Sequence, residues 1–366
     1  MEERLAWLAW QWILPGSAKQ IRALAAYCGS ARAAWAARAG ELAGASPLSA
    51  ERINEIVQRR ATVEPAALAE KLQQLAINYL CFEDAQYPKP LRDTFDPPVV
   101  LFYRGVLPDP AELAVALVGA RKPTPYGRVV AEKLAKDLAA VGITVVSGMA
   151  RGIDTAAHSG ALAAGGRTVA VLGCGLDVVY PRENKKLMER ITASGAVISE
   201  FPPGDPPEAW HFPARNRIIS GLSLGTVVVE AGEKSGALIT ASYALEQGRD
   251  VMAVPGNVTS ALSRGPHSLL RQGARLVEGA GDIIDELGLE KLFPLPAQAT
   301  PTTLKISPEE EILYKLLSLE PLALDRLIGQ SGLTPQKVMA ALMYMELKGL
   351  AKQLPGKFYI RTGPEK

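Results

Sequence analysis

The chain has 366 residues, more than one hydrophobic core usually accommodates, so two or three domains are expected. Hydrophobic residues make up 48% and charged residues 21%, as in ordinary globular proteins, and no apolar run is long enough to span a membrane. Forty basic and 38 acidic side chains leave a net charge of +2, so bulk charge cannot indicate a nucleic-acid partner. Three scattered cysteines indicate neither a disulfide framework nor a zinc site, and we expect a cytoplasmic protein.

Residues 1–80 are rich in Ala, Leu and Arg with helical periodicity, and we predict a small helical domain. Ser17, with Gln20 three residues later, predicts a capping box at a helix start. Ser49 stands in the same way before the helical segment 51–60. Residues 81–112 are rich in Pro, Asp and aromatic residues, and they read as a connector that contains a short strand at 99–105.

From 113 to about 288, short apolar runs alternate with helical patterns. The runs are LAVALVG (113–119), ITVVSG (143–148), RTVAVLG (167–173), AVISE (196–200), TVVVE (226–230), DVMAVPG (250–256) and ARLVEG (274–279). Continuous apolar strands alternating with helices are typical of a parallel sheet covered on both faces. We therefore predict an α/β, doubly wound, Rossmann-like domain over 81–290, connector included.

Residues 291–305, rich in Pro and Thr, are predicted to be an interdomain linker, and 306–366 a winged-helix domain. Ser307 with Glu310, and Thr334 before Pro335, mark the starts of its first and third helices. Of the third helix, we expect only Gln336, Lys337 and Tyr344 to point outward. Seven basic and six acidic residues between 306 and 362 make no basic stripe, which favours a weak duplex-DNA or protein contact.

Three loops at the carboxyl ends of predicted strands carry basic residues and glycines, where open parallel sheets bind ligands. The first, after 113–119, combines Gly119 with Arg121 and Lys122 and contains no acid up to residue 128. The second places Gly148 and Arg151 before a helix that Asp154 is expected to cap. The first loop is therefore an anion site by composition.

The third loop is HFPARNRIISGLS, residues 211–223, where Phe212 stands close to Arg215, Asn216 and Arg217 at a helix start. Basic groups that hold phosphates beside an aromatic ring that stacks on a base form a sequence-tolerant single-strand binding site. The complete set of residues that we predict to bind DNA is Gly119, Arg121, Lys122, Gly148, Arg151, Phe212, Arg215, Asn216, Arg217, Ser235, Gly236 and Arg264.

Residues with catalytic potential are few, and we predict no catalytic residue, metal or cofactor. Gly173-Cys174-Gly175 fails the dinucleotide fingerprint because Val178 occupies the third glycine position, and no ATP-binding P-loop motif occurs. Cys174 and His158 are expected to be packed inside the protein. Glu230, at a strand end, is the one residue that could serve nucleotide N-glycosidic chemistry.

The chain resembles the DNA processing protein A (DprA/Smf) family over nearly its whole length. The matching blocks include VGARKPTPYG, VVSGMARGIDTAAH, TVAVLGCGLDVVYPREN, FPARNRIISGLS, VVVEAGEKSGALITASYALEQGRDV and AVPGNVTSALSRGPHSLLRQGA. The resemblance implies a helical, sterile-alpha-motif-like N-terminal domain, a Rossmann-like core and a winged C-terminal domain.

For function, the resemblance implies a homodimer, formed through the Rossmann-like domain, that binds single-stranded DNA, protects incoming DNA and helps load RecA during natural transformation. It also implies that Arg121 contacts DNA phosphate and that Phe212 contacts bases, with Arg215, Asn216 and Arg217 completing the block.

The sequence leaves two other classes of function open. One is a nucleotide phosphoribohydrolase-like enzyme on the same core. Such enzymes resemble P-G-G-x-G-T-x-x-E at the strand end, whereas the segment that begins Glu230-Ala231-Gly232-Glu233 lacks the double glycine and the downstream acid. The other is a winged-helix transcription regulator, which the weakly charged third helix disfavours.

Overall fold

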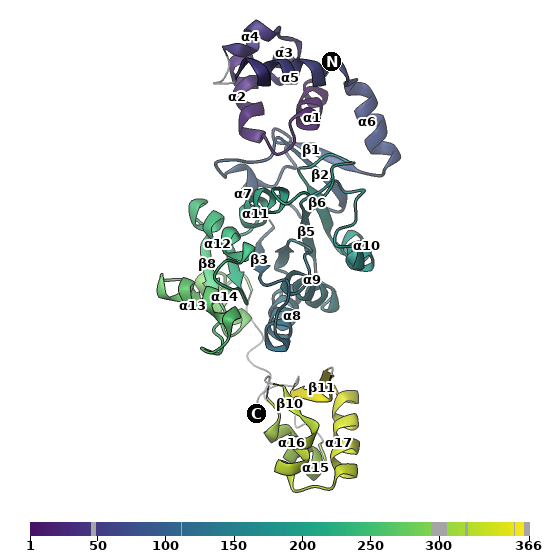
Figure 1. The fold of residues 1–366 in the computed structure, drawn as a ribbon, viewed down its shortest axis with the longest axis vertical. Helices are drawn as coiled ribbons and strands as arrows, with labels where there is room; N and C mark the ends of the chain where they lie inside the picture. Colours follow the sequence, from purple (N-terminus) through teal and green to yellow (C-terminus); the bar gives the residue numbers. More distant parts are fainter. Residues whose placement is uncertain (45–48, 111, 294–305, 319–320, 355, 362–366) are drawn as a thin grey trace.

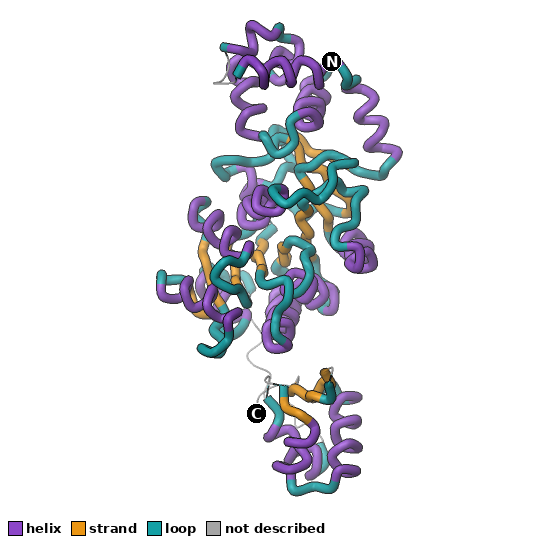
Figure 2. The backbone as a smooth tube through the Cα atoms, viewed as in Figure 1, coloured by secondary structure: helices purple, strands orange, loops and turns teal. Residues whose placement is uncertain are grey.

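A computed structural model describes residues 1–44, 49–110, 112–293, 306–318, 321–354 and 356–361 (Figure 1). It contains an N-terminal helical part, a central α/β domain and a C-terminal lobe with its own small sheet (Figure 2). No described helix is long and apolar enough to cross a membrane. The predicted linker falls mostly outside the described residues, since 294–305 are not among them.

The N-terminal part is helical, as predicted. Its helices are α1 (Glu3–Ile13), α2 (Ala18–Cys28), α3 (Ala31–Ala36), α4 (Ala39–Ala43), α5 (Ala50–Ala61) and α6 (Pro65–Gln74). Ser49 caps α5 by accepting from the Arg52 N–H at 3.2 Å. Ser17 precedes α2, but its side chain makes no capping hydrogen bond, so the predicted capping box does not form.

The central domain is built on a nine-stranded sheet in the order β1-β2-β6-β5-β4-β3-β7-β8-β9. The strands are β1 (Asn78–Cys81), β2 (Val100–Gly105), β3 (Ala114–Val118), β4 (Thr144–Ser147), β5 (Thr168–Leu172), β6 (Ala196–Ser199), β7 (Gly225–Val228), β8 (Asp250–Ala253) and β9 (Arg275–Leu276). Strands β3 to β9 pair in parallel. The order reverses at β3, which lies between β4 and β7, so the doubly wound prediction is confirmed.

Helices cover both faces of this sheet, and β3 is consequently buried along its whole length. Val115 and Leu117 pack in one hydrophobic cluster, and Ala114 and Ala116 pack in the cluster on the other face. The helices of the domain are α7 (Lys89–Arg92), α8 (Pro125–Ala140), α9 (Ile153–Ala163), α10 (Lys185–Ser194), α11 (His211–Gly221), α12 (Gly236–Glu246), α13 (Arg264–Arg271) and α14 (Ala280–Glu286), with short 3-10 helices η1 (Arg182–Asn184) and η2 (Ala261–Ser263).

Part of the segment predicted to be a connector, residues 81–112, belongs to the main sheet. The expected strand within it is β2, but β2 lies inside the main sheet, antiparallel to both β1 and β6. Phe102 of β2 is fully buried in a cluster that also contains Trp10 and Leu24 of the helical part. The helical part therefore shares a continuous core with the antiparallel edge of the sheet.

The C-terminal lobe has the winged-helix order, with α15 (Pro308–Leu316), α16 (Leu324–Ser331) and α17 (Pro335–Leu347) and a sheet of β10 (Leu322–Ala323), β12 (Phe358–Arg361) and β11 (Ala351–Leu354). Ser307 and Glu310 form the predicted capping box. The outward face of α17 differs from the prediction, because Met339, Met343 and Leu347 are exposed alongside Tyr344. Residues 362–366 of the predicted domain lie outside the described residues.

Candidate nucleic-acid interface

A cavity of about 580 Å³ opens at the carboxyl ends of the parallel strands, beside the point where the strand order reverses. Together with a narrower cleft next to it, it is lined by nine of the twelve predicted DNA-binding residues: Gly119, Arg121, Gly148, Arg151, Phe212, Arg215, Asn216, Ser235 and Gly236. The loops after β3, β4 and β7 and the start of α11 thus converge, as the strand-end argument predicts.

The loop after β3 is held in place by Glu230, which is 3% exposed. Its carboxylate accepts from the Thr124 N–H at 2.8 Å and from the Thr124 hydroxyl at 2.6 Å. Gly119 is required here by close approach, since an added Cβ would lie 2.6 Å from Ile153 Cγ1 and 2.8 Å from the Glu230 carbonyl oxygen. The anchored loop presents Arg121 to solvent at the mouth of the cavity.

Arg121, Phe212 and Tyr180 form a short stack on the cavity wall. The Arg121 guanidinium carbon lies 5.2 Å from the centroid of the Phe212 ring. The Tyr180 ring lies 5.4 Å from Phe212 on a tilt of 38°, and Tyr180 is 39% exposed. Among the described residues, Arg121 has no carboxylate partner, so its charge is available to a ligand beside the exposed ring of Tyr180.

Arg215 lies beneath this stack rather than at the surface, with only 4% of its area exposed. It donates to the carbonyl oxygens of Gly148, at 2.7 Å, and of Val171. Burial lowers its pKa to about 10, despite the opposing effect of Asp154, so the guanidinium is charged at neutral pH. Gly148 gives it room, because an added Cβ would lie 2.6 Å from Arg215 Nη2.

Arg217 does not reach the cavity, which corrects its predicted role as a DNA contact. It makes a two-bond ion pair with buried Glu200, at 2.6 and 2.8 Å, and a further contact to Asp96 at 3.3 Å. Although burial lowers the pKa of Arg217, the two carboxylates raise it above the ordinary arginine value. Residues two apart on a helix point about 200° apart, so Arg215 and Arg217 face opposite sides of α11.

The other predicted cations differ in what they can offer a ligand. Lys122 is exposed on the same loop as Arg121 but does not line the cavity. Arg151 lines the narrower cleft, yet it forms an exposed ion pair with Glu183. Arg264 lies outside both cavities and pairs with Glu233 at 3.5 Å. Arg121 is therefore the predicted cation that combines exposure, a place in the cavity and an unpaired charge.

Polar groups from three helices, α9, α11 and α12, also line the cavity. Asn216 donates from Nδ2 to the Gly236 carbonyl at 3.2 Å, which joins α11 to the start of α12. Ser235 is the N-cap of α12, and its hydroxyl accepts from the Ala237 N–H at 3.4 Å. Asp154 lies in the first turn of α9 and accepts from the Ala150 N–H at 3.3 Å, and burial raises its pKa.

Tyr180 is the cavity residue that the sequence did not single out. It lines both the cavity and the narrower cleft and contacts Phe212. An exposed aromatic residue directly before Pro181, ahead of a basic segment, was the available signal. It comes from the loop after β5, which has Gly173 and Gly175 but no basic residue before Tyr180, so it did not match the pattern used to find the other loops.

The residues that could have supported catalysis are buried inside the domain. Glu230 is bound to Thr124 and lines neither cavity. His158 is fully buried, where burial lowers its pKa to about 3, and its Nδ1 lies 2.7 Å from the Thr168 hydroxyl. Burial raises the pKa of the Cys174 thiol to about 12, which makes it a poor nucleophile.

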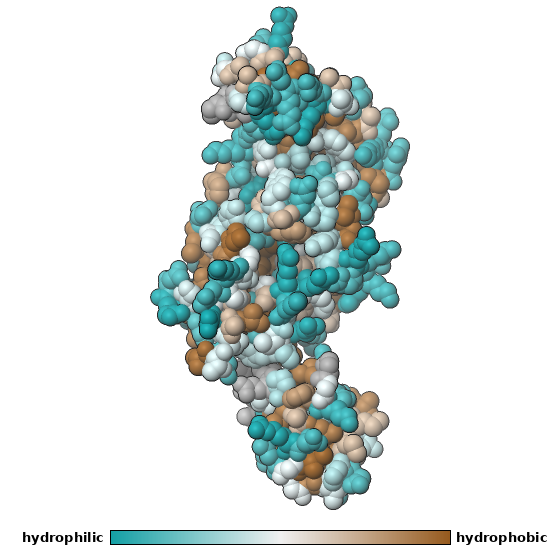
Figure 3. All heavy atoms as spheres, in the orientation of Figure 1, coloured by the Kyte–Doolittle hydropathy of each residue, from teal (hydrophilic) through white to brown (hydrophobic). Residues whose placement is uncertain are grey.

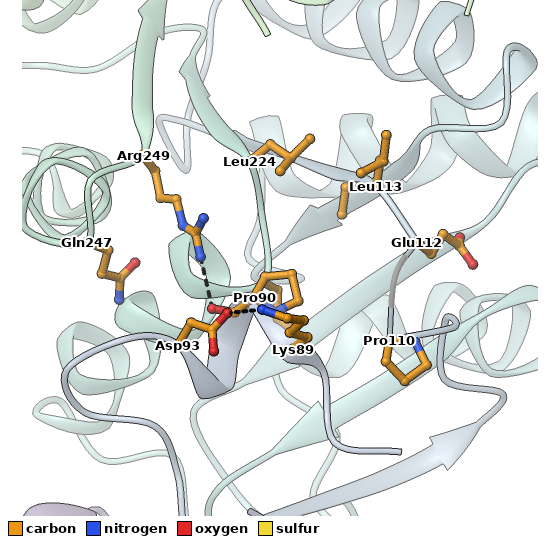
Figure 4. Close-up of a pocket in the computed structure, with 11 residues that line it drawn as sticks. Lys89, Pro90, Asp93, Pro110, Glu112, Leu113, Leu224, Gln247 and Arg249 are labelled. Carbon is orange, nitrogen blue, oxygen red and sulfur yellow. Dashed lines mark hydrogen bonds and ion pairs between the residues drawn. The ribbon is translucent and has the colours of Figure 1, made fainter. Parts of the chain in front are cut away.

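Another cavity, of about 290 Å³, lies at the opposite edge of the sheet, where β3, β7 and β8 begin (Figure 4). Its charged groups already have partners: Lys89 pairs with Asp93 at 2.7 Å, Arg249 donates to the Pro90 carbonyl at 2.9 Å, and Glu112 pairs with Arg167. Ligands of open α/β sheets bind at the other side, where the carboxyl ends of the strands lie. We therefore assign the site to the cavity around Arg121 and Phe212.

The fold and the site together define a Rossmann-like protein with a basic, aromatic cavity and an attached winged helix. The family model of DNA recombination-mediator protein A matches residues 78–288, and that of the DprA winged helix domain matches residues 294–357. The chain is 36% identical to Protein Smf from Synechocystis, over 98% of this chain and 99% of that protein. The protein belongs to the DNA recombination-mediator protein A (DprA/Smf) family, and its role is in DNA recombination.

Solved structures agree with this assignment. DNA processing protein A from Streptococcus pneumoniae superposes with a TM-score of 0.67 at 37% identity, covering 77% of this chain and 97% of that one. DNA processing protein A from Helicobacter pylori, whose structure describes a single-stranded DNA binding mode, gives a TM-score of 0.51 at 31% identity, covering 58% and 95%.

The internal pairing of Arg217 generates a stability prediction. Arg217→Met should destabilise the protein by about 3–5 kcal/mol, because it leaves the Glu200 carboxylate buried without its cation. Urea unfolding measures the change, with Lys89→Met, which breaks an exposed and solvent-screened pair, as the control expected to leave the stability nearly unchanged. Equal effects of the two substitutions would contradict the structural role of Arg217.

Proposed function

We propose that the cavity around Arg121 and Phe212 binds single-stranded DNA without strong sequence preference. The observation that carries the proposal is the stack in which an unpaired, exposed guanidinium lies 5.2 Å from an aromatic ring beside a second exposed aromatic ring. A cation can bind a backbone phosphate while Phe212 or Tyr180 stacks on a base, which every base permits. The similar Helicobacter pylori protein, whose mode of binding single-stranded DNA has been described, supports this assignment.

We further propose that the protein acts on incoming DNA during natural transformation, in the cytoplasm and as a homodimer formed through the Rossmann-like domain. In this proposal it protects the strand and helps load RecA. Membership of a recombination-mediator family supports the role, since a mediator must hold the strand that a recombinase will occupy. Binding through a few phosphates and stacked bases suits such a handover, because each contact can be released separately.

For the winged-helix lobe we propose a protein contact, or at most weak duplex binding. The exposed face of α17, where winged-helix proteins read DNA, carries Met339, Met343 and Leu347. Its Lys337 and Lys348 are engaged by Glu309 and Glu310. An apolar face with neutralised cations lacks the basic character that duplex DNA requires.

We propose a binding protein with no covalent chemistry rather than a nucleotide hydrolase. The hydrolase alternative depends on a free carboxylate at the end of β7, whereas Glu230 is buried and accepts two hydrogen bonds from Thr124. A general base must lie within hydrogen-bond reach of the substrate. Release of free base from AMP, abolished in Glu230→Ala, would instead support the enzyme.

Arg121→Ala should weaken binding to single-stranded DNA and flatten its salt dependence, because one phosphate contact is lost. The slope of log affinity against log salt concentration should fall by roughly 0.7. Fluorescence anisotropy with a labelled oligothymidylate at several salt concentrations measures both quantities. Lys136→Ala, which removes an exposed cation from α8, is the control expected to change neither. Wild-type affinity and slope in Arg121→Ala would reject the phosphate contact.

Phe212→Leu should weaken the same binding by about 1–3 kcal/mol and leave the salt slope unchanged, because a stacking surface is lost but no charge. Phe212→Tyr keeps the ring and should retain most of the affinity. The same anisotropy titration separates the two effects. A flattened slope with intact affinity in Phe212→Leu would show that the ring does not stack on a base.

The mediator role makes a separate prediction about RecA. On single-stranded DNA coated with single-strand-binding protein, the wild-type protein should shorten the delay before RecA filaments form, and Arg121→Ala should not. The rate of RecA-dependent ATP hydrolysis measures the delay. A delay that the wild-type protein leaves unchanged would exclude RecA loading, while DNA binding itself would stand.

A further inference from the structure

A cluster of four cations lies on η1 and the first turns of α10, next to the cavity. The cluster, called here the α10 basic face, consists of Arg182, Lys185, Lys186 and Arg190. All four side chains are exposed, and the surface over α10 is strongly hydrophilic (Figure 3). Lys186 and Arg190 are four residues apart and therefore lie on one side of the helix, about one turn of roughly 5.4 Å from each other.

The α10 basic face directly follows, in the chain, two residues that line the narrower cleft. Tyr180 and Pro181 line the narrower cleft, and Arg182 follows them directly in the chain. Asn184 fixes the position of this turn by donating to the Met149 carbonyl at 2.9 Å and to the Thr155 hydroxyl at 3.0 Å. The loop after β4 that lines the cleft and the start of α10 are thus joined as one rigid surface.

The four cations of the cluster have no direct ion-pair partner among the described residues. None of its four cations takes part in an ion pair or side-chain hydrogen bond. The two nearby acids in the sequence are Glu183 and Glu189, and Glu183 is engaged by Arg151. A protein with a net charge of +2 therefore has a strongly positive local surface beside its cavity.

We propose that single-stranded DNA leaving the cavity over Tyr180 continues along the α10 basic face, with its phosphates bound by Arg182, Lys186 and Arg190. This extends the proposed function and rests on the cavity being a single-strand site. The cavity binds the first nucleotides by stacking and charge, whereas the α10 basic face binds backbone alone. Affinity then grows with strand length beyond what the cavity holds.

The test compares Lys186→Ala/Arg190→Ala with Lys133→Ala/Lys136→Ala, which removes two exposed cations from α8. Each is titrated with oligothymidylates of about 6 and about 20 nucleotides and with a duplex of the longer length. The Lys186/Arg190 variant should bind the short strand as the wild type does and the long strand more weakly. Its salt slope on the long strand should fall by roughly 1.4, for two lost phosphate contacts. The α8 variant should change none of these values.

The outcomes separate this inference from the function on which it rests. If the wild-type protein binds neither strand, the proposed function fails. If it binds the long strand and the Lys186/Arg190 variant binds it equally well, only the α10 path is overturned. A loss confined to the duplex would also overturn the path, since it would assign the α10 basic face to double-stranded DNA. Circular dichroism of each variant verifies that helicity is retained.

Discussion

The ion pair between Arg217 and Glu200 anchors α11, the helix on which the rest of the site depends. It joins the helix to the end of β6, and Asp96 links the same guanidinium to Arg22 of the helical part at 2.8 Å. With one side of α11 fixed in this way, Arg215 on the other side reaches the carbonyl groups of the strand-end loops. Phe212, at the start of the helix, is thereby held against Arg121.

The helical part takes part in this arrangement. Gly16, between α1 and α2, adopts a φ of +67°, and an added Cβ there would lie 3.1 Å from the ring of Trp210. Trp210 precedes α11 and packs edge-on against Phe201 and His211. Gln11 donates to the Glu200 carbonyl at 2.6 Å. The N-terminal helices therefore support the start of α11 through both packing and a hydrogen bond.

Charge in this protein is divided between structure and surface. Arg215 and Arg217 are buried and fully engaged, so they shape the cavity and hold its helix. Arg121 is exposed and has no carboxylate partner within the described ranges, and the same holds for the cations of the α10 basic face. A near-neutral chain can thus present a positive surface locally, because its charges are unevenly distributed: Glu200 is buried with Arg217, while Arg121 and the α10 basic face lie outside.

The sequence by itself determined the core of alternating strands and helices and the order of elements in the winged helix. It also determined that the site forms at the carboxyl ends of the parallel strands. Apolar periodicity reports burial on each strand, and parallel strands bring their carboxyl ends together whatever the loop details. It also identified nine residues that line the cavity and its cleft. The composition of residues 81–112 suggested a connector, yet β2 lies in the sheet, since strand pairing with β6 depends on residues nearly a hundred positions away.

Only the tertiary structure decided which arginine faces a ligand. Arg217 and Arg215 look alike in the sequence, but the partners of Arg217 lie 17 and 121 residues away, so no local pattern reveals its pairing. Tyr180 joined the site for the same reason, because its neighbour Phe212 comes from another loop. Residue type fixes what a side chain can bind, whereas burial and long-range partners decide what it does bind.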